Sequence, residues 1–414
     1  MAERPLWLPR HAEAPLRRAL EVSPVVCLLG PRQCGKSGLA QHYDSSRPYF
    51  TLDDPALLDA AIADPGGFVA GLPPIVTLDE IQRAPGLLRA IKMSVDRDRT
   101  PGRFLLTGSA DLLLLPAVSE SLAGRMEVVR LHPFTEAEKE RRPGRFLEDV
   151  LAGSLTPRVR SGQPAPHELV RRLLQGGFPE ATRRPTNRLR QWHRAYVDAL
   201  IDRDARDVAN LRNLEHLRAL LTTLAHQTAQ LLNVNAAAKH LGIRRETVEN
   251  HLAALERLFL VRRVLAWHPN EARRLVKAPK VHVVDCGVAS ALIGLTENDW
   301  NTERERFGHV LESFVLQQLT AQAASADPDL GLWHYRDKDL IEVDVVITRG
   351  RKVWGVEVKT GVAVTETDGR GLRRLADATG RQFQGGIILY AGLSTLPTAD
   401  TRVLAVPLTE LWSR

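Results

Sequence analysis

The segment from Gly30 to Ser37 constrains the fold of this chain most, because it follows the pattern GxxxxGK[ST] of phosphate-binding loops. The apolar residues Val25–Leu29 precede it and predict a strand, and a helix is expected to begin near Lys36. In such a unit the backbone N–H groups of the loop and the amino end of the helix face one concavity that suits a triphosphate. The sequence therefore predicts a nucleotide site in an α/β domain.

The loop residues are expected to share the contacts with the nucleotide. Lys36 is expected to bridge the β- and γ-phosphates, and Ser37 to offer its hydroxyl to Mg²⁺. Cys34 is either a thiol whose oxidation impairs binding or a tolerated small residue. ATP and Mg²⁺ are the predicted cofactors, and the predicted loop contacts are Gly30, Pro31, Arg32, Gln33, Cys34, Gly35, Lys36 and Ser37.

A second apolar strand, Ile75 to Asp79, ends in two neighbouring carboxylates. After a complete phosphate loop, this arrangement is the one that ATP hydrolysis requires. Asp79 is expected to hold Mg²⁺ through water, and Glu80 to polarise the attacking water. Both acids are therefore predicted members of the nucleotide site.

A third strand is expected from Arg103 to Ser109, and its polar end offers two hydroxyls. Thr107 or Ser109 could reach the γ-phosphate or the attacking water, and a plain strand-terminal turn is the alternative. Further on, Arg125 is a candidate for the cation that a neighbouring subunit supplies during phosphoryl transfer. A surface salt bridge is the competing role for this arginine.

Strands alternate with helical segments from Val25 to Leu131, which indicates a parallel α/β sheet. With these motifs the chain resembles an AAA-like P-loop ATPase family of bacteria and archaea, and the resemblance covers nearly the whole chain. The motifs that carry it are Gly30 to Ser37, Leu78 to Gln82, Leu105 to Ser109, Leu122 to Arg125, Pro133-Phe134 with Glu136, and Gln175 to Pro179.

The resemblance implies two further features. The segment Gln175 to Pro179 looks like the GGxP element of the family, a lid whose proline, here Pro179, would pack near the adenine. Together with the need for a cation from a neighbour, the resemblance also implies a homo-oligomer, such as a ring.

The middle of the chain is expected to be helical. Residues Lys139 to Pro166 are rich in Arg, Pro and Gly and are interpreted as a loop or linker, with helices expected from His167 onward. Val234 to Leu252 shows two helices around Gly242, and Leu258 to Val264 follows as a strand-like wing. This is a winged-helix pattern, in which the second helix could read DNA through Arg244, Arg245, Thr247 and Asn250. A lid or a subunit contact is the alternative.

Acidic residues gather in the last part of the chain. Glu312 lies in an expected helix, and Asp344 and Glu357 lie on two apolar strands that must form a hairpin. Because side chains two apart on a strand share a face, Glu357 and Lys359 are expected to point the same way. Clustered carboxylates repel one another unless a cation joins them, so Glu312, Asp344 and Glu357 are predicted ligands of Mg²⁺ or Mn²⁺.

This acid set resembles the PD-(D/E)xK nuclease superfamily at Glu312, Asp344, Glu357 and Lys359, with Val343 where many members have proline. The resemblance implies a restriction-endonuclease-like α/β domain in which Lys359 positions or deprotonates a metal-bound water. A domain that binds DNA but has lost cleavage is the alternative.

Composition sets the remaining limits. No run approaches the roughly 18 to 20 apolar residues that span a bilayer, and the first residues lack an apolar signal core, so no membrane contact and a cytoplasmic protein are expected. The net charge of +7 is compatible with a polyanionic partner such as DNA. A codon bias of the genome that enriches arginine would also produce a positive net charge.

The complete prediction has four domains: a P-loop ATPase core (1–140), a linker and helical lid (141–210), a winged-helix-like domain (211–300) and a nuclease-like domain (301–414). Such a chain would be an ATP-hydrolysing enzyme that acts on DNA. Two alternatives stay open: an ATP-gated DNA-binding module without cleavage, and a protein-remodelling switch.

Overall fold

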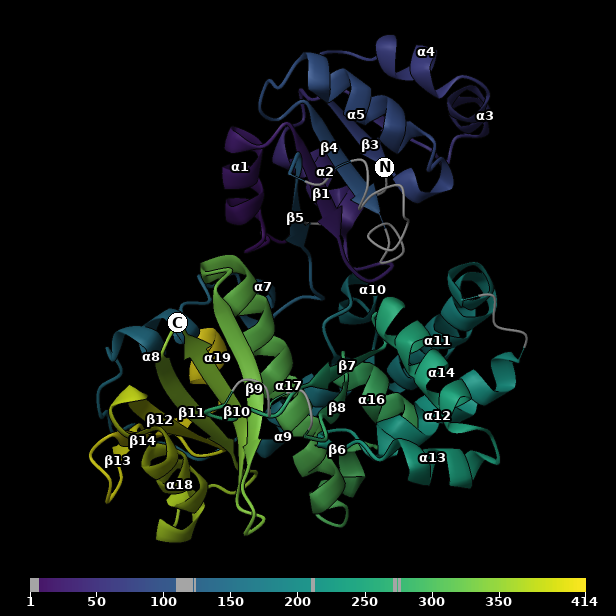
Figure 1. Cartoon of the computed structure of the whole chain (residues 1–414). Coiled ribbons are helices and arrows are strands. Elements are labelled where there is room, and N and C mark those ends of the chain that lie inside the picture. Colours follow the sequence, from purple (N-terminus) through teal and green to yellow (C-terminus); the bar gives the residue numbers. More distant parts are fainter. Residues whose placement is uncertain (1–6, 109–121, 123, 210–212, 271–273, 275–276) are drawn as a thin grey trace. The chain divides into compact units, whose positions relative to one another are not determined.

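The computed structural model describes residues 7–108, 122, 124–209, 213–270, 274 and 277–414. The chain divides into two compact units, residues 1–134 with 257–259, and residues 135–256 with 260–414 (Figure 1). Each unit has its own sheets and its own buried core. None of the helices in the described part of the chain has the length and apolar character needed to cross a membrane.

The first unit alternates strands and helices along the chain. Its elements are α1 (Glu13–Val22), β1 (Val25–Leu29), α2 (Lys36–Tyr43), β2 (Tyr49–Thr51), α3 (Pro55–Ala63), α4 (Pro65–Ala70), β3 (Val76–Asp79), α5 (Leu87–Arg97), β4 (Phe104–Gly108) and β5 (Met126–Arg130).

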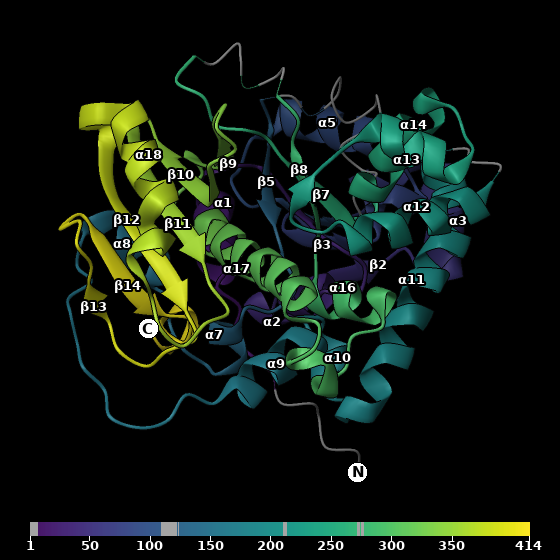
Figure 2. The ribbon, with the colours of Figure 1, turned by 90° about the horizontal axis from the view of Figure 1, so that it is seen from below.

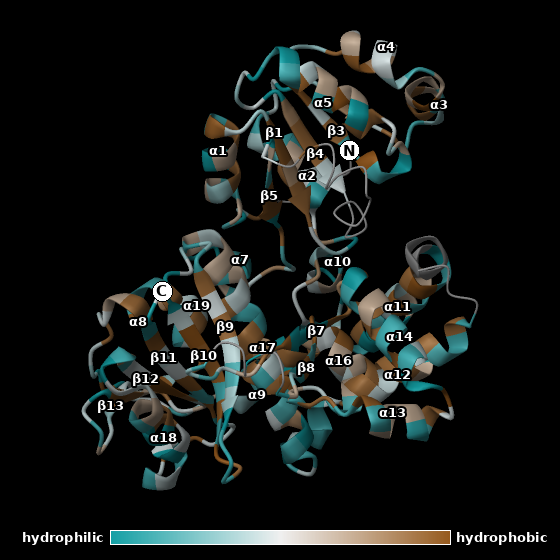
Figure 3. Ribbon diagram, in the orientation of Figure 1, coloured by the Kyte–Doolittle hydropathy of each residue, from teal (hydrophilic) through white to brown (hydrophobic). Residues whose placement is uncertain are grey.

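These strands form one parallel sheet in the order β2-β3-β4-β1-β5. Every residue of β1, β3 and β4 is buried, and Figure 3 shows apolar colouring along these strands. Continuous apolar strands are typical of parallel sheets with both faces covered. The predicted parallel α/β core is therefore confirmed. Strand β4 separates the phosphate-loop strand β1 from the acid strand β3, so the carboxyl ends of all three strands meet at one edge.

The second unit is helical at first and ends in a mixed sheet. Its helical part contains α7 (Glu136–Lys139), α8 (Phe146–Ala152), α9 (Pro166–Gln175), α10 (Pro179–Thr182), α11 (Thr186–Ala209), α12 (Leu214–His226), β6 (Gln230–Leu231), α13 (Val234–Leu241), α14 (Arg245–Arg257), β7 (Val261–Val264), β8 (Lys280–Val283) and α16 (Cys286–Ile293). Its last part contains α17 (Arg304–Ala326), β9 (Leu330–Arg336), β10 (Glu342–Arg349), β11 (Lys352–Val358), α18 (Arg370–Thr379), β12 (Phe383–Tyr390), β13 (Leu396–Pro397), β14 (Val403–Pro407) and α19 (Glu410–Ser413).

The predicted pair of helices around Gly242 is present as α13 and α14. Gly242 ends α13 in the left-handed conformation, with φ of 66°, a backbone geometry that glycine adopts without steric cost. Val248, Leu252 and Leu255 of α14 are buried. The antiparallel pair β7 and β8 follows, and β6 completes a sheet in the order β6-β8-β7.

The loop predicted for Lys139 to Pro166 is wrong in part, because Phe146–Ala152 form helix α8. Phe146 and Leu147 are fully buried, and the side chain of Gln322 in α17 accepts a hydrogen bond from the Leu147 N–H. The helix has only seven residues, and its flanking segments are rich in Arg, Pro and Gly. Its stability therefore comes from packing against distant residues, which the local sequence does not reveal.

The C-terminal sheet has the order β13-β14-β12-β11-β10-β9, with β10 and β11 antiparallel as the predicted hairpin requires. Helix α18 lies against the strands of this sheet (Figure 2). Leu372 and Leu375 of α18 share one buried core cluster with Val343 and Val346 of β10. The pairing of β10 with β9 shifts register by one residue between Val343 and Val346, so β10 carries an extra residue in the segment that contains Asp344. A bulge of this kind changes the direction in which a side chain points.

Candidate functional site

The phosphate loop has the backbone that its pattern predicts. Residues 30–35 connect β1 to α2, which begins at Lys36. A Cβ atom at Gly30 would lie 2.1 Å from the Leu131 carbonyl oxygen, and Gly35 has φ of 99°, so both positions require glycine. The predicted strand, loop and helix are therefore confirmed in detail.

Lys36 lies over its own loop and is buried. Its Nζ donates hydrogen bonds to the carbonyl oxygens of Gly30, at 3.0 Å, and Pro31, at 2.8 Å. The ammonium group is thus held at the mouth of the loop, where the phosphates of a nucleotide are expected.

Beneath the loop lies a buried arginine that sequence reasoning missed. Arg10 donates from Nη1 to the Cys34 carbonyl oxygen, at 2.8 Å, and its guanidinium stacks on Phe134. Burial raises the pKa of the Cys34 thiol, despite the nearby Lys36 and Arg10. A buried thiol of raised pKa is unreactive, which favours the reading of Cys34 as a tolerated small residue.

Asp79, at the end of β3, joins side chains from three other elements. Its carboxylate accepts hydrogen bonds from the hydroxyls of Ser37, at 3.0 Å, Tyr49, at 2.6 Å, and Thr107. The two predicted magnesium residues, Ser37 and Asp79, are therefore in direct contact. A hydroxyl beside a carboxylate provides the oxygen ligands that Mg²⁺ prefers, so these residues fit the predicted cation. When bound, Mg²⁺ would neutralise phosphate charge at this point.

Tyr49 was not a predicted site residue, since it lies on the short strand β2. We expect Tyr49→Phe to weaken binding of Mg²⁺-ATP about tenfold, because a hydrogen bond to a charged group contributes about 1.5–3 kcal/mol. Titration of a fluorescent ATP analogue with and without Mg²⁺ measures the change. Tyr43→Phe, on α2, is the matched control, and equal weakening by both variants would contradict a specific role for Tyr49.

Glu80 follows Asp79 in an unusual backbone conformation. Its φ of 58° is left-handed, its N–H donates to the Thr107 hydroxyl, and its carboxylate accepts a hydrogen bond from the Gln82 side chain. Non-glycine residues adopt this conformation mostly where tertiary contacts enforce it, often at functional sites. Thr107 thus contacts both predicted acidic positions, through the side chain of Asp79 and the backbone of Glu80.

The roles predicted for two further residues of the ATPase core, Ser109 and Arg125, are not confirmed. Ser109 lies outside the described residues. Arg125 forms an ion pair with Asp96 of α5, at 2.6 Å between Nε and Oδ1. The salt-bridge role weighed for Arg125 is thus present within this chain, and a role in a neighbouring subunit stays a prediction.

The GGxP segment is built around Asp285, the capping residue of α16. A Cβ atom at Gly176 would lie 2.2 Å from the Asp285 carboxylate, which accepts a hydrogen bond from the Gly177 N–H at 2.7 Å. Gly176 is therefore needed for this close approach, and Gly177 contributes its backbone N–H. Pro179 begins α10 in the second unit, and its predicted place near adenine stays a prediction.

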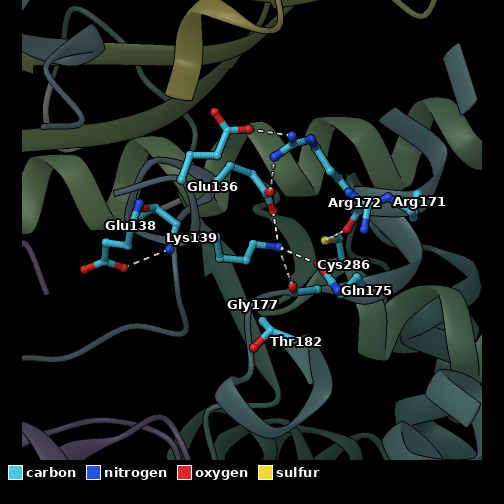
Figure 4. A network of polar contacts seen from close by, with 12 residues as sticks. Glu136, Glu138, Lys139, Arg171, Arg172, Gln175, Gly177, Thr182 and Cys286 are labelled. Atoms are coloured by element: carbon cyan, nitrogen blue, oxygen red, sulfur yellow. Dashed lines mark hydrogen bonds and ion pairs between the residues drawn. The ribbon is translucent and has the colours of Figure 1, made fainter. Parts of the chain in front are cut away.

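A buried polar network extends from this segment (Figure 4). Lys139 donates to the Gly176 carbonyl oxygen and pairs with Glu136, which also pairs with Arg172 at 2.6 Å. Glu136 is 2% exposed. The motif residue Glu136 and the GGxP segment therefore belong to one ion-pair network within the second unit.

The predicted C-terminal acids lie close together. Lys359 Nζ contacts Glu357 Oε1 at 2.8 Å, which confirms that the two side chains point the same way. Across the hairpin, Asp344 Oδ2 accepts a hydrogen bond from the Val358 N–H at 2.8 Å. Burial, with the charge of Asp344 nearby, raises the pKa of the Glu357 carboxyl to about 8, and Glu357 Oε2 has no hydrogen-bond partner.

A lysine that the sequence did not mark as functional lies within this cluster. Lys280 of β8 contacts Glu312 at 2.8 Å, Glu342 at 3.3 Å and Asp344 at 3.6 Å. Burial would lower its pKa, but the charges of Glu312 and Asp344 outweigh burial and raise the pKa. Lys280 is therefore a charged ammonium among the carboxylates.

The fit of a divalent cation to these acids is poor. Among the residues that the structure describes, no group of three or more His, Cys, Asp or Glu side chains is arranged to hold a metal ion. The metal role of Glu312, Asp344 and Glu357 stays a prediction.

Comparison with known families divides the chain into three parts. An AAA domain model matches residues 22–139, and two domains of unknown function, DUF8612 and DUF4143, match residues 166–299 and 307–411. Among solved structures, the Walker-type ATPase PABY2304 of Pyrococcus abyssi is 18% identical with a TM-score of 0.44, and covers 69% of this chain and 96% of that chain. A RuvB variant of Thermotoga maritima is 19% identical with a TM-score of 0.31, over 72% of this chain and 95% of that chain.

Two curated relatives match almost the whole chain. They are the uncharacterized proteins Rv2008c of Mycobacterium tuberculosis and Mb2031c of Mycobacterium bovis, each 32% identical over 405 residues, which cover 97% of this chain and 84% of the relative. The AAA domain match agrees with the phosphate loop, the acid strand and the parallel sheet described above. The chain therefore belongs to the family of these two mycobacterial proteins and is an ATPase of the AAA, P-loop type.

Proposed function

We propose that this ATPase acts on DNA and that ATP binding controls how tightly it holds DNA. The observation that carries this proposal is the solvent-facing side of α14. Val248 and Leu252 of α14 are buried, while Arg245 and Asn250 are exposed, and the exposed Arg244 directly precedes the helix. Arg245 pairs with Glu249 on the same helix at 3.0 Å. A second helix of such a pair, with cationic and amide side chains facing solvent, suits the major groove of DNA.

The surroundings of α14 support a winged-helix module. The antiparallel pair β7 and β8 directly follows α14 along the chain, as the strands of a wing follow the helices of such a module. A cavity of about 600 Å³ is lined mainly by residues of the β7–β8 connection and of β9 with the turn after it, among them the cations Lys277, Arg336 and Lys338 and the acid Asp337. Cationic side chains around an opening favour contact with a phosphate backbone.

DNA binding by α14 is tested with the double change Arg244→Ala and Asn250→Ala. We expect affinity for duplex DNA to fall at least about tenfold, because each good base contact contributes about 1–3 kcal/mol. Fluorescence anisotropy over a range of salt concentrations, with and without ATP, measures the change. Lys36→Ala is expected to remove the dependence on ATP but to leave binding without nucleotide unchanged.

Arg17→Ala is the matched control, since it removes an exposed helix arginine from α1. Equal affinity of the double variant and the native chain would contradict DNA reading by α14. If the native chain shows no binding to DNA by anisotropy, and DNA does not change its rate of ATP hydrolysis, a protein-remodelling switch becomes the better interpretation.

A metal-dependent nuclease is a second candidate, favoured by the partnerless Oε2 atom of buried Glu357. It requires a metal ion in the C-terminal carboxylate cluster, so this candidate and the internal cation inferred below exclude each other. Its test is strand scission of plasmid and linear DNA with Mn²⁺, with and without ATP. Scission that Lys359→Ala abolishes while phosphate release continues would support this candidate. Absence of scission would leave the ATP-gated DNA-binding reading.

We further propose a homo-oligomer in which Arg125 leaves Asp96 to reach the nucleotide of a neighbour. Arg125→Ala would then lower ATP hydrolysis without lowering ATP binding, and mass photometry with ATP would show assemblies larger than one chain. A single-chain mass at all concentrations of ATP would contradict this part of the proposal.

A further inference from the structure

We propose that the ammonium group of Lys280 takes the place of a divalent cation in the C-terminal carboxylate cluster. In this reading, the cluster of the native chain is held together by an internal cation and does not take up Mg²⁺ or Mn²⁺. The inference concerns the second unit alone and is independent of DNA binding by α14.

The first argument is the position of Lys280 Nζ. It lies 2.8 Å from Glu312 Oε1 and 3.6 Å from Asp344 Oδ1, so it bridges a helix and a strand as a metal ion in this cluster would. The side chain is 3% exposed, so the lysine does not extend into solvent. A buried ammonium is retained only where carboxylates compensate its charge.

The second argument is that most carboxylate oxygens facing the cluster already have partners. Glu312 Oε1 contacts Lys280, Asp344 Oδ2 accepts from the Val358 N–H, and Glu357 Oε1 contacts Lys359. In contrast to these oxygens, the buried Oε2 atom of Glu357 has no hydrogen-bond partner. Mg²⁺ needs near-octahedral oxygen ligands at about 2.0–2.1 Å, which this arrangement does not supply while Lys280 is in place.

The third argument is the balance of charge. In the described cluster, the carboxylates of Glu312, Glu342, Asp344 and Glu357 face the cations Lys280, Arg336 and Lys359. Even with all four acids ionised, adding a divalent cation to this set would leave an excess of positive charge in a buried place. Removing Lys280 would instead leave an excess of negative charge, which a divalent cation could neutralise.

Lys280 and its carboxylate partners come from different parts of the second unit. Lys280 belongs to β8 in the small sheet β6-β8-β7, whereas its partners belong to α17 and β10. Next to it, the Trp267 N–H donates to the His334 carbonyl oxygen at 2.6 Å, and the His334 N–H donates to the Leu265 carbonyl oxygen at 3.1 Å. The ammonium therefore joins the winged-helix-like region to the C-terminal sheet, where a metal would join only the acids.

The test is Mn²⁺ binding by the full chain without nucleotide, measured by calorimetry and by the shift in melting temperature. We expect Lys280→Ala to bind Mn²⁺ at least about tenfold more tightly than the native chain, because the freed carboxylates need a cation. The gain should disappear in the double variant Lys280→Ala with Glu357→Gln. Lys277→Ala, on the neighbouring cavity, is the matched control and should show no gain.

Two outcomes would overturn the proposal. One is Mn²⁺ binding by the native chain that Glu357→Gln removes, since that places a metal beside Lys280. The other is a folded Lys280→Ala variant with no added Mn²⁺ affinity. Where Lys280→Ala unfolds, Mn²⁺ should restore its melting transition, and Lys280→Arg should fold without metal. The native-chain measurement decides the matter even when neither variant folds.

Discussion

Replacing Glu80 with Gln is expected to lower the rate of ATP hydrolysis by about 10²–10³-fold and to leave ATP binding intact. Glutamine keeps the size of the side chain and the left-handed backbone, but it cannot accept a proton from the attacking water. The carboxylate of Glu80 accepts a hydrogen bond from Gln82, and the Glu80 N–H donates to Thr107, whose hydroxyl also contacts Asp79. Phosphate release at saturating ATP, together with binding of a fluorescent ATP analogue, separates the two effects.

Glu127→Gln is the matched control, because this glutamate lies on β5 in the same sheet and contacts Ser23 instead. Its hydrolysis rate should equal that of the native chain. If Glu80→Gln hydrolyses ATP at the native rate, the proposed role of Glu80 is wrong, and another group must activate the water.

Replacing Glu136 with Ala is expected to destabilise the second unit by about 3 kcal/mol, because it leaves the buried ammonium of Lys139 without its carboxylate partner and removes one of the carboxylates that pair with Arg172. Glu136 joins Lys139 at 2.5 Å and Arg172 at 2.6 Å, and these partners are only 10% and 12% exposed. Differential scanning calorimetry should show the melting temperature of this unit lowered by about 10 °C.

Glu168→Ala is the matched control for this change. Glu168 also pairs with Arg172, at 2.8 Å, but it is 42% exposed, and exposed pairs contribute less than about 1 kcal/mol. Similar melting temperatures for the two variants would show that the buried ion pairs of Glu136 contribute no more to stability than the exposed pair of Glu168. ATP hydrolysis per folded chain should stay near the native value in both.

The sequence predicted those features that depend on short-range pattern. The strand Val25–Leu29 and the helix start at Lys36 agree with the structure residue by residue, because the loop pattern fixes its own backbone. The helices around Gly242 were predicted for the same reason, since the glycine turn and the spacing of Val248, Leu252 and Leu255 are local signals.

The sequence did not predict features that depend on partners distant along the chain. Lys280 lies in no recognisable motif, and its partners lie on a helix and a hairpin that only the folded unit brings near. Tyr49 and Arg10 carry no motif, so their contacts with Asp79 and Cys34 left no sequence signal. Helix α8 was missed because its amphipathic face is too short to stand out from its flanks.

The register shift of β10 between Val343 and Val346, beside Asp344, affects how this strand tolerates a change in its length. One residue more than the partner strand requires is accommodated there, so the alternation of inward and outward side chains is interrupted beside the carboxylate. Deleting a single residue at this point would straighten the strand and turn the acid toward the opposite face of the sheet. In relatives of this chain, a one-residue gap at this position therefore indicates a different local chemistry even where the aspartate is kept.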